Sequence, residues 1–284
     1  MKKMFSNKLL LSALFFCFCM PLFAQLGMHL VLNRRVYMQY EPVYACISLR
    51  NNSGKTLIFG QDPKLQGFIY FLIVDRNGRT IAKRPGREIS TTGLVLRPGE
   101  TRSLVLQIGD FYELDNPGSY SVNVCVTHNM LSKEYKCRVE RNFVIETGVE
   151  VWSEKVGIPD LNSQNPGALT SKERRYSIRL LTEEPHKHYY LFVEDDKMVY
   201  GVSRLGKKCG FEKIKAETDM LGRIHLLIPM SSKVFHYLTF SLDGTNTGSS
   251  YWKTTRTIPT IYRDKKADLS GVSAAKRQKE ESIT

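Results

Sequence analysis

The sequence predicts an all-β protein made of two successive β units. Three observations favour this fold class: short apolar or alternating runs recur along the chain, no stretch shows the 3.6-residue periodicity of an amphipathic helix, and Asn-Gly and Pro-Gly pairs separate the runs. Strands of this length and spacing are typical of antiparallel sandwiches. The expected architecture is an antiparallel sandwich followed by a second, small antiparallel sheet.

The first 24 residues have the pattern of a secretory signal peptide. Lys2, Lys3 and Lys8 precede a short apolar run that ends at Ala24, and the run is shorter than the ~20 residues of a membrane span. The mature chain is therefore expected to begin at Gln25, without a membrane span, and to be exported as a soluble periplasmic or extracellular protein.

Residues 25–147 are expected to form the first β unit. Its predicted strands are 28–32, 43–49, 56–59, 68–74, 80–82, 103–108, 119–127 and 135–145. Asn77-Gly78 predicts a type I′ hairpin turn, because both residues tolerate positive φ angles. Pro98-Gly99 and Pro117-Gly118 predict two further turns.

Four runs of this unit resemble a known family pattern, namely 47–55, 71–78, 96–100 and 117–122. Together they resemble secreted bacterial immunoglobulin-like sandwiches, in an order similar to that of the bacterial intracellular proteinase inhibitor family. The resemblance covers about 39–145 and implies an immunoglobulin-like antiparallel sandwich, with Tyr120 at the place of a tyrosine corner. Val122 stands where antibody domains carry a cysteine, so their disulfide is not expected. This fold serves adhesion, inhibition and spacer roles alike.

Residues 148–172 are rich in Gly, Pro, Asn and Ser, which predicts a linker. A second, uncharacterised β domain is expected over 173–263. Its predicted strands are 176–181, 189–193, 198–205, 224–228, 234–242 and 251–255. The segments 189–205 and 224–242 each predict a hairpin. The tail 264–284 has almost no large apolar side chain and is expected to be disordered.

Without the signal peptide, four cysteines remain, and an exported protein can form disulfides. Cys125 and Cys137 flank a loop, and a directly opposed pair on a hairpin would be close enough for a bridge. We expect that disulfide, with four free thiols as the alternative. The pairing of Cys46 and Cys209 stays open.

A search for catalytic motifs predicts no enzyme. Neither nucleotide-binding glycine loop is present, and Ser203 lies in a predicted strand rather than at a strand-to-helix turn. His225 and His236 are interpreted as structural sheet residues. His186 and His188 are weak metal candidates, because alternate strand positions share a face. No cofactor is expected.

The net charge of +13, from 41 Lys and Arg against 28 Asp and Glu, is interpreted first as a solvated basic surface, with an anionic partner of the cell envelope as the functional alternative. Nucleic acid is not expected for an exported protein without a recognised binding module. The densest basic stretches are 83–87 and the loop with Arg204, Lys207 and Lys208. With Tyr251 and Trp252, these last three residues are the predicted ligand-binding set.

The leading functional hypothesis is a non-enzymatic binding protein of the cell envelope that recognises an envelope protein or an anionic glycan. A secreted proteinase inhibitor is the alternative, and residues 84–93 would then form an exposed, extended inhibitory loop. A hydrolase carried by the second β domain comes third, with His225 as its candidate residue. The oligomeric state stays open.

Overall fold

The computed structural model describes residues 25–60, 62, 66–131, 133–159, 171–210, 212–219, 221–254, 258–263 and 272–274. The predicted signal peptide 1–24 lies outside the described residues. No helix in the described part of the chain is long and apolar enough to cross a membrane. The prediction of an all-β protein is confirmed, because strands make up the regular structure of these residues apart from one short 3-10 helix, η2 (Ile108–Asp110).

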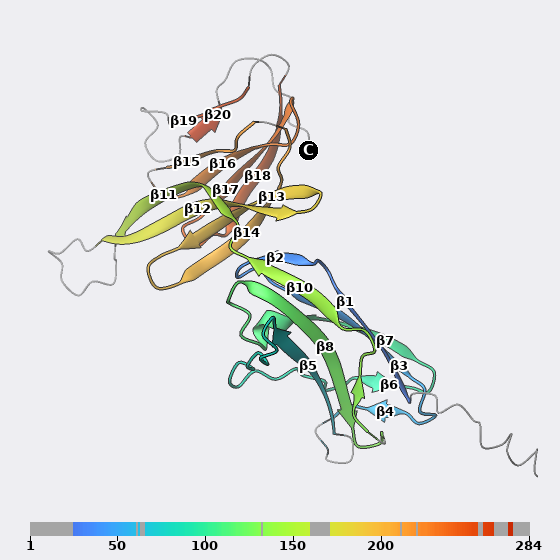
Figure 1. Ribbon diagram of the computed structural model, residues 1–284. Coiled ribbons are helices and arrows are strands. Elements are labelled where there is room, and N and C mark those ends of the chain that lie inside the picture. The colour runs from blue at the N-terminus through green and yellow to red at the C-terminus, as the bar shows by residue number, and fades with distance from the viewer. Residues whose placement is uncertain are drawn as a thin grey trace, which may run out of the picture. The chain divides into compact units, whose positions relative to one another are not determined.

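The first half of the chain forms three sheets (Figure 1). One has the order β1 (Leu26–Leu32), β3 (Tyr44–Asn51), β7 (Thr101–Gln107). The second has the order β2 (Val36–Met38), β10 (Arg141–Glu146), β8 (Gly118–His128), β5 (Gly67–Asp75), with β9 (Tyr135–Lys136) on β8. A small pair joins β4 (Leu57–Ile58) to β6 (Val95–Leu96). The strand β5 is therefore an edge strand.

Alternation along these strands explains which side chains are buried. In β3, Ala45, Ile47 and Leu49 are buried while their neighbours are more exposed. In β5, Ile69, Phe71 and Ile73 are buried, whereas Phe68 lies on the opposite face. A period of two places one set of side chains in the core and the other outside it.

The second half of the chain forms two four-stranded antiparallel sheets. The first joins β11 (Val149–Pro159), β12 (Ser171–Glu183), β13 (His186–Glu194) and β14 (Val199–Lys207). The second joins β15 (Lys215–Thr218), β16 (Ile224–Pro229), β17 (Val234–Phe240) and β18 (Asn246–Lys253). The hairpins predicted over 189–205 and 224–242 are confirmed. A separate pair joins β19 (Ile261–Arg263) to β20 (Val272–Ala274), so the prediction of a disordered tail is wrong for 272–274.

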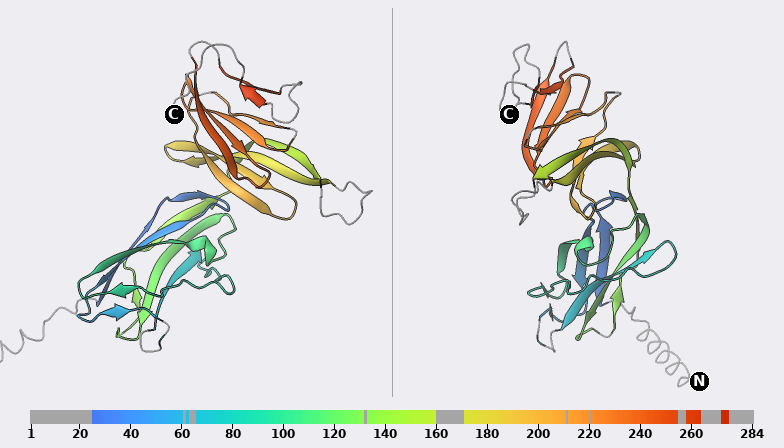
Figure 2. Two further views of the ribbon diagram at one scale, coloured as in Figure 1. Left: turned by 180° about the vertical axis from the view of Figure 1, so that it is seen from behind. Right: turned by 90° about the vertical axis from the view of Figure 1, so that its left-hand side faces the viewer.

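These two sheets lie next to each other (Figure 2), and their buried side chains form one apolar core. It is built from Tyr176, Ile178, Tyr189, Leu191, Val193 and Leu205 on the first sheet and Ile224, Leu226, Ile228, Leu238 and Phe240 on the second. Burial of eleven large side chains between two sheets is the main stabilising contribution expected of a sandwich.

Residue contacts divide the chain into two compact units. The first contains residues 43–113 and 120–142 with the N-terminal segment, and the second contains 34–42, 114–119 and 143–284. Two short segments from the first half of the sequence thus belong to the second unit. The prediction of a linker over 148–172 is wrong for Val149–Pro159, which form β11 in antiparallel register with β12.

The predicted disulfide between Cys125 and Cys137 is also wrong. Cys125 lies opposite Lys136, so Cys137 is one position beyond the register that would place the two thiols together. A shift of one residue turns a side chain to the other face of the strand. The Cys137 thiol donates instead to the Met28 carbonyl at 3.6 Å. All four cysteines in the described chain are free.

Candidate functional site

A basic groove lies beside the edge strand β5 in the first unit. It has a volume of about 780 Å³ and lies between Phe68, Ile69 and Tyr70 of β5, the segment 83–89, and Phe111 and Tyr112. The groove exists because β5 pairs with β8 on one side only, so the chain that follows β5 returns past its other edge.

The ends of this edge are closed by side-chain hydroxyl groups. Tyr112 lies 2% exposed, and its hydroxyl accepts a hydrogen bond from Phe71 N–H and donates one to Phe71 C=O, both at 2.8 Å. The Thr91 hydroxyl donates to the Gly67 carbonyl at 3.1 Å. These bonds satisfy main-chain groups that would otherwise attract further strands.

One wall of the groove is aromatic and cationic. Phe68 is 50% exposed, which is high for a large apolar side chain. The Lys83 ammonium lies 5.2 Å from the centroid of the Tyr70 ring, within the range of a cation–π contact. The Tyr70 hydroxyl donates to Glu134 Oε2 at 2.5 Å, and burial together with this bond raises the pKa of Tyr70. Tyr70 therefore stays protonated and in place.

The other wall is the basic segment 84–89. Arg84 is held at both its side chain and its main chain. Its Nε donates to the Gly109 carbonyl at 2.9 Å, and its main-chain N–H donates to the Phe111 carbonyl. A turn at Pro85 and Gly86, where φ is +68° at the glycine, then exposes Arg87. The lining contains three cations, Lys83, Arg84 and Arg87, against one acid, Glu88. An anionic ligand therefore suits this groove electrostatically.

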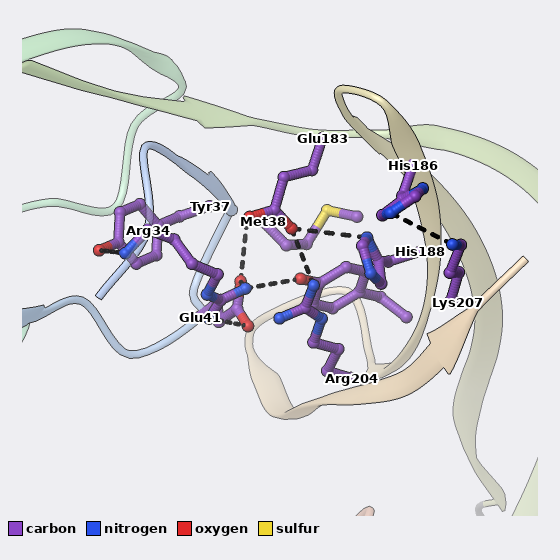
Figure 3. A network of polar contacts seen from close by, with 10 residues as sticks. Arg34, Tyr37, Met38, Glu41, Glu183, His186, His188, Arg204 and Lys207 are labelled. Carbon is purple, nitrogen blue, oxygen red and sulfur yellow. Dashed lines mark hydrogen bonds and ion pairs between the residues drawn. The ribbon is translucent and has the colours of Figure 1, made fainter. Parts of the chain in front are cut away.

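The predicted basic residues of the second unit lie around the β12–β13 turn (Figure 3). Arg204 is paired with Glu183, Nη2 to Oε2 at 2.8 Å. Lys207 lies beside His186, Nζ to Nε2 at 3.2 Å. Lys208 follows the end of β14, and its N–H donates to the Lys187 carbonyl at 2.7 Å. The Arg204 charge is therefore already compensated within the protein.

The weak metal candidates His186 and His188 contact different partners (Figure 3). Their ring centroids are 6.5 Å apart, and His188 Nδ1 lies 3.5 Å from Glu183 Oε2. Burial, followed by the nearby Arg204 charge, lowers the pKa of His188. Among the described residues, no group of three or more potential ligands is found that could hold a metal ion.

An ion pair between Arg34 and Glu41 lies beside His188 and Arg204 (Figure 3). Arg34 contacts Glu41 in a two-pronged arrangement, at 2.6 and 3.1 Å, and donates to the Tyr190 hydroxyl at 2.9 Å. Burial raises the pKa of Tyr190 to about 12. The contacts hold the segment 34–42 on the face of β13 that carries Tyr190, where Met38 also packs.

The structure does not bring Tyr251 and Trp252 to the predicted basic residues. Both lie on β18, in the other sheet of the second unit. Tyr251 stacks on His236 with ring centroids 4.3 Å apart, and Trp252 packs on the apolar cluster around Phe235. The predicted ligand-binding set is therefore divided between two sheets.

His225, the candidate residue of the hydrolase hypothesis, is buried in a hydrogen-bonded chain. Its Nδ1 lies 2.6 Å from the Tyr237 hydroxyl and its Nε2 lies 3.1 Å from Asp219 Oδ2. Asp219 is also paired with Arg223 at 2.7 Å. Burial opposes ionisation of Asp219, but hydrogen bonds from His225 and Arg223 outweigh it and lower its pKa. Both ring nitrogens of His225 are thus engaged within the protein.

Sequence reasoning found only part of the groove. The basic stretch 83–87 stands out from the sequence, whereas Phe68 and Tyr70 read as ordinary strand residues. The signal available was their parity, because both alternate with the core residues of β5 and so lie on its other face.

No protein-family model matches the chain, and no curated protein matches it. Among solved structures, one that matches is the crystal structure of the YadV chaperone. It shares 7% identity, covers 80% of this chain and all of the other, and gives a TM-score of 0.25. A likeness of this size carries no argument about the function of this chain.

Proposed function

We propose that this protein is an exported, non-enzymatic binding protein of the cell envelope that recognises an anionic ligand through the groove beside β5. The observation that supports the proposal is the composition of that groove, in which three cations and exposed aromatic surface meet in about 780 Å³. The predicted signal peptide at 1–24 supports export, and an envelope protein or an anionic glycan is the expected partner.

The chemistry of the groove favours binding. Lys83 stands over an aromatic ring, which holds a long and flexible side chain in one place. Phe68 and the ring of Tyr70 offer apolar surface beside the charges. Apolar contact and charge together are typical of recognition sites.

The test is retention on immobilised poly-glutamate and on immobilised polygalacturonate during a salt gradient. We expect the double variant Lys83→Glu and Arg87→Glu to lose at least about tenfold in affinity, which corresponds to ~1.4 kcal/mol. The matched control is Lys55→Glu with Arg76→Glu, since both residues are exposed and lie outside the groove lining. An equal loss in the control would show that net charge alone decides retention, and the proposal would then fail.

Export has its own test. The protein is expressed with its full sequence, and the N-terminus of the purified envelope fraction is determined. We expect it at Gln25. A protein that stays in the cytoplasm with Met1 intact would contradict the export part of the proposal but leave the groove experiment unaffected.

A second candidate function is proteinase inhibition. It is favoured by the segment 84–93, where no strand forms and residues 85–88 are all exposed. An inhibitor of this kind titrates a protease to zero activity at a one-to-one ratio. Cleavage of 84–93 without loss of protease activity would eliminate this candidate.

A further inference from the structure

In the described part of the chain, the edge of β5 is open at Ile69. Phe71 directs its N–H and C=O away from β8, as its bonds to Tyr112 show, and Ile73 does the same, because its carbonyl accepts from Ile81 N–H at 2.8 Å. Main-chain groups repeat their direction every second residue along a strand, so Ile69 also directs its N–H and C=O toward this edge. Within the part of the chain that the structure describes, neither group of Ile69 has a hydrogen-bond partner.

Hydrogen-bonded main-chain groups lie on both sides of Ile69, and Ile69 itself lines the groove. On one side, the Thr91 hydroxyl occupies the Gly67 carbonyl, and on the other, Tyr112 occupies Phe71. Ile69 lies between these two contacts, in the lining of the basic groove. The unpaired stretch is therefore only three residues long, which is room for a short added strand and not for extended edge-to-edge aggregation.

The side chains around Ile69 in the groove lining are of two main kinds, apolar and cationic. Phe68 and Tyr70 lie on one face of β5, the Lys83 ammonium lies over the Tyr70 ring, and Arg87 belongs to the opposite wall. A strand added at Ile69 would present its side chains alternately, so that apolar and acidic residues in turn suit this surface. Main-chain bonds would supply affinity, and the alternate side chains would supply specificity.

We propose that the groove binds an extended peptide segment with acidic side chains, which adds to the edge of β5 by pairing with Ile69. This inference rests on the proposed function, since it names the ligand class of the same groove. A peptide is favoured over a glycan because its backbone carries an N–H and a C=O at the spacing that a strand edge requires. Sugar hydroxyl groups have no such fixed alternation.

The experiment uses fluorescence anisotropy with the mature chain and two probes. One is a labelled seven-residue peptide in which Glu alternates with Val, and the other is a labelled oligogalacturonate of equal charge. Each peptide amide is then N-methylated in turn, which removes one donor. We expect the peptide to bind. We expect methylation of the one amide that donates to the Ile69 carbonyl to weaken binding about tenfold, while methylation of its neighbours, which have the other parity, changes it less than about threefold.

A second readout follows amide hydrogen exchange in the protein. We expect saturating peptide to slow exchange at Ile69 by at least about tenfold. Phe68 provides the matched control, because its main chain faces β8 and its exchange should change much less.

Four outcomes are distinguishable. If N-methylation weakens peptide binding at one amide and not at its neighbours, and the double variant Lys83→Glu with Arg87→Glu also weakens it, strand addition is supported. Peptide binding with equal effects at both parities overturns strand addition and leaves the proposed binding function in place. Binding of the oligogalacturonate alone has the same consequence and assigns the groove to glycans. If neither probe binds, both the inference and the proposed function are wrong.

Discussion

The hydroxyl of Tyr112 provides the sharpest test of the edge described above. It is buried and makes two bonds of 2.8 Å with the main chain of Phe71. In Tyr112→Phe the N–H and C=O of Phe71 lose their partner. An unsatisfied buried polar group costs about 1–3 kcal/mol, so two such groups should lower the free energy of unfolding of the first unit by about 2–6 kcal/mol.

The measurement needs a local probe. Both tryptophans, Trp152 and Trp252, belong to the second unit, so tryptophan fluorescence does not follow the first. Far-UV circular dichroism follows the strands of both units, so amide hydrogen exchange at Phe71 is the probe that is local to the first unit. Amide exchange at Phe71 should accelerate about 30-fold or more, since ~1.4 kcal/mol corresponds to a factor of ten.

A matched variant separates this effect from loss of any tyrosine hydroxyl. Tyr135→Phe removes two longer contacts of 3.2 Å to Gln25, which are only partly buried, and should cost less than about 1 kcal/mol. If Tyr112→Phe unfolds within about 0.5 kcal/mol of the wild type, and Phe71 exchanges at the wild-type rate, the reasoning about the closed edge is refuted.

Three further predictions concern the rest of the molecule. Asp219→Asn should lower the stability of the second unit by about 1–3 kcal/mol at pH 7, followed by tryptophan fluorescence, because it removes the buried carboxylate that contacts Arg223 and His225. The pKa of Asp219 is lowered in the folded protein, so this contribution to stability is complete above the ordinary pKa near 4 and is lost as pH falls through the lower folded value. If the variant lost stability in acid along the same curve as the wild type, this reasoning would be contradicted. Cys125 and Cys137 should both react with iodoacetamide after unfolding without reductant, and a linked peptide in the mass map would contradict the register. Gly148→Ala places a Cβ 2.7 Å from a side-chain atom at a φ of +68°, and it should lower the free energy of unfolding by about 2 kcal/mol or more. Gly54→Ala has a similar φ of +74° but open space around the Cβ, so it should lower stability less. Equal shifts of the melting temperature in the two variants would show that packing at residue 148 contributes nothing.

Alternation and turn chemistry were sufficient to predict most strands. The predicted run 68–74 lies within β5, and 224–228 lies within β16, because a buried face with period two leaves a clear pattern. The strand β11 was missed because glycines, prolines and asparagines later in the same segment suggested a linker. The run Val149-Glu150-Val151-Trp152 is rich in β-branched and aromatic residues, so a narrower window would have found it.

The site was harder to predict because it depends on sheet order. Nothing in the residues 67–75 says that β5 lies at an edge, since that follows from which strands pair with β8. The Cys125–Cys137 prediction failed for a related reason: it required a hairpin register that depends on the exact pairing of β8 with β9. The immunoglobulin-like resemblance of 39–145 stays a prediction.

The two sheets of the second unit differ from those of the first in how far apart their partners are in sequence. From β11 to β14, and again from β15 to β18, each strand pairs with the strand that precedes or follows it. Such local pairing gives a low contact order, and chains with low contact order fold quickly. Each meander can therefore form while its own residues leave the ribosome, and only the packing of the two sheets over their shared core needs the whole segment.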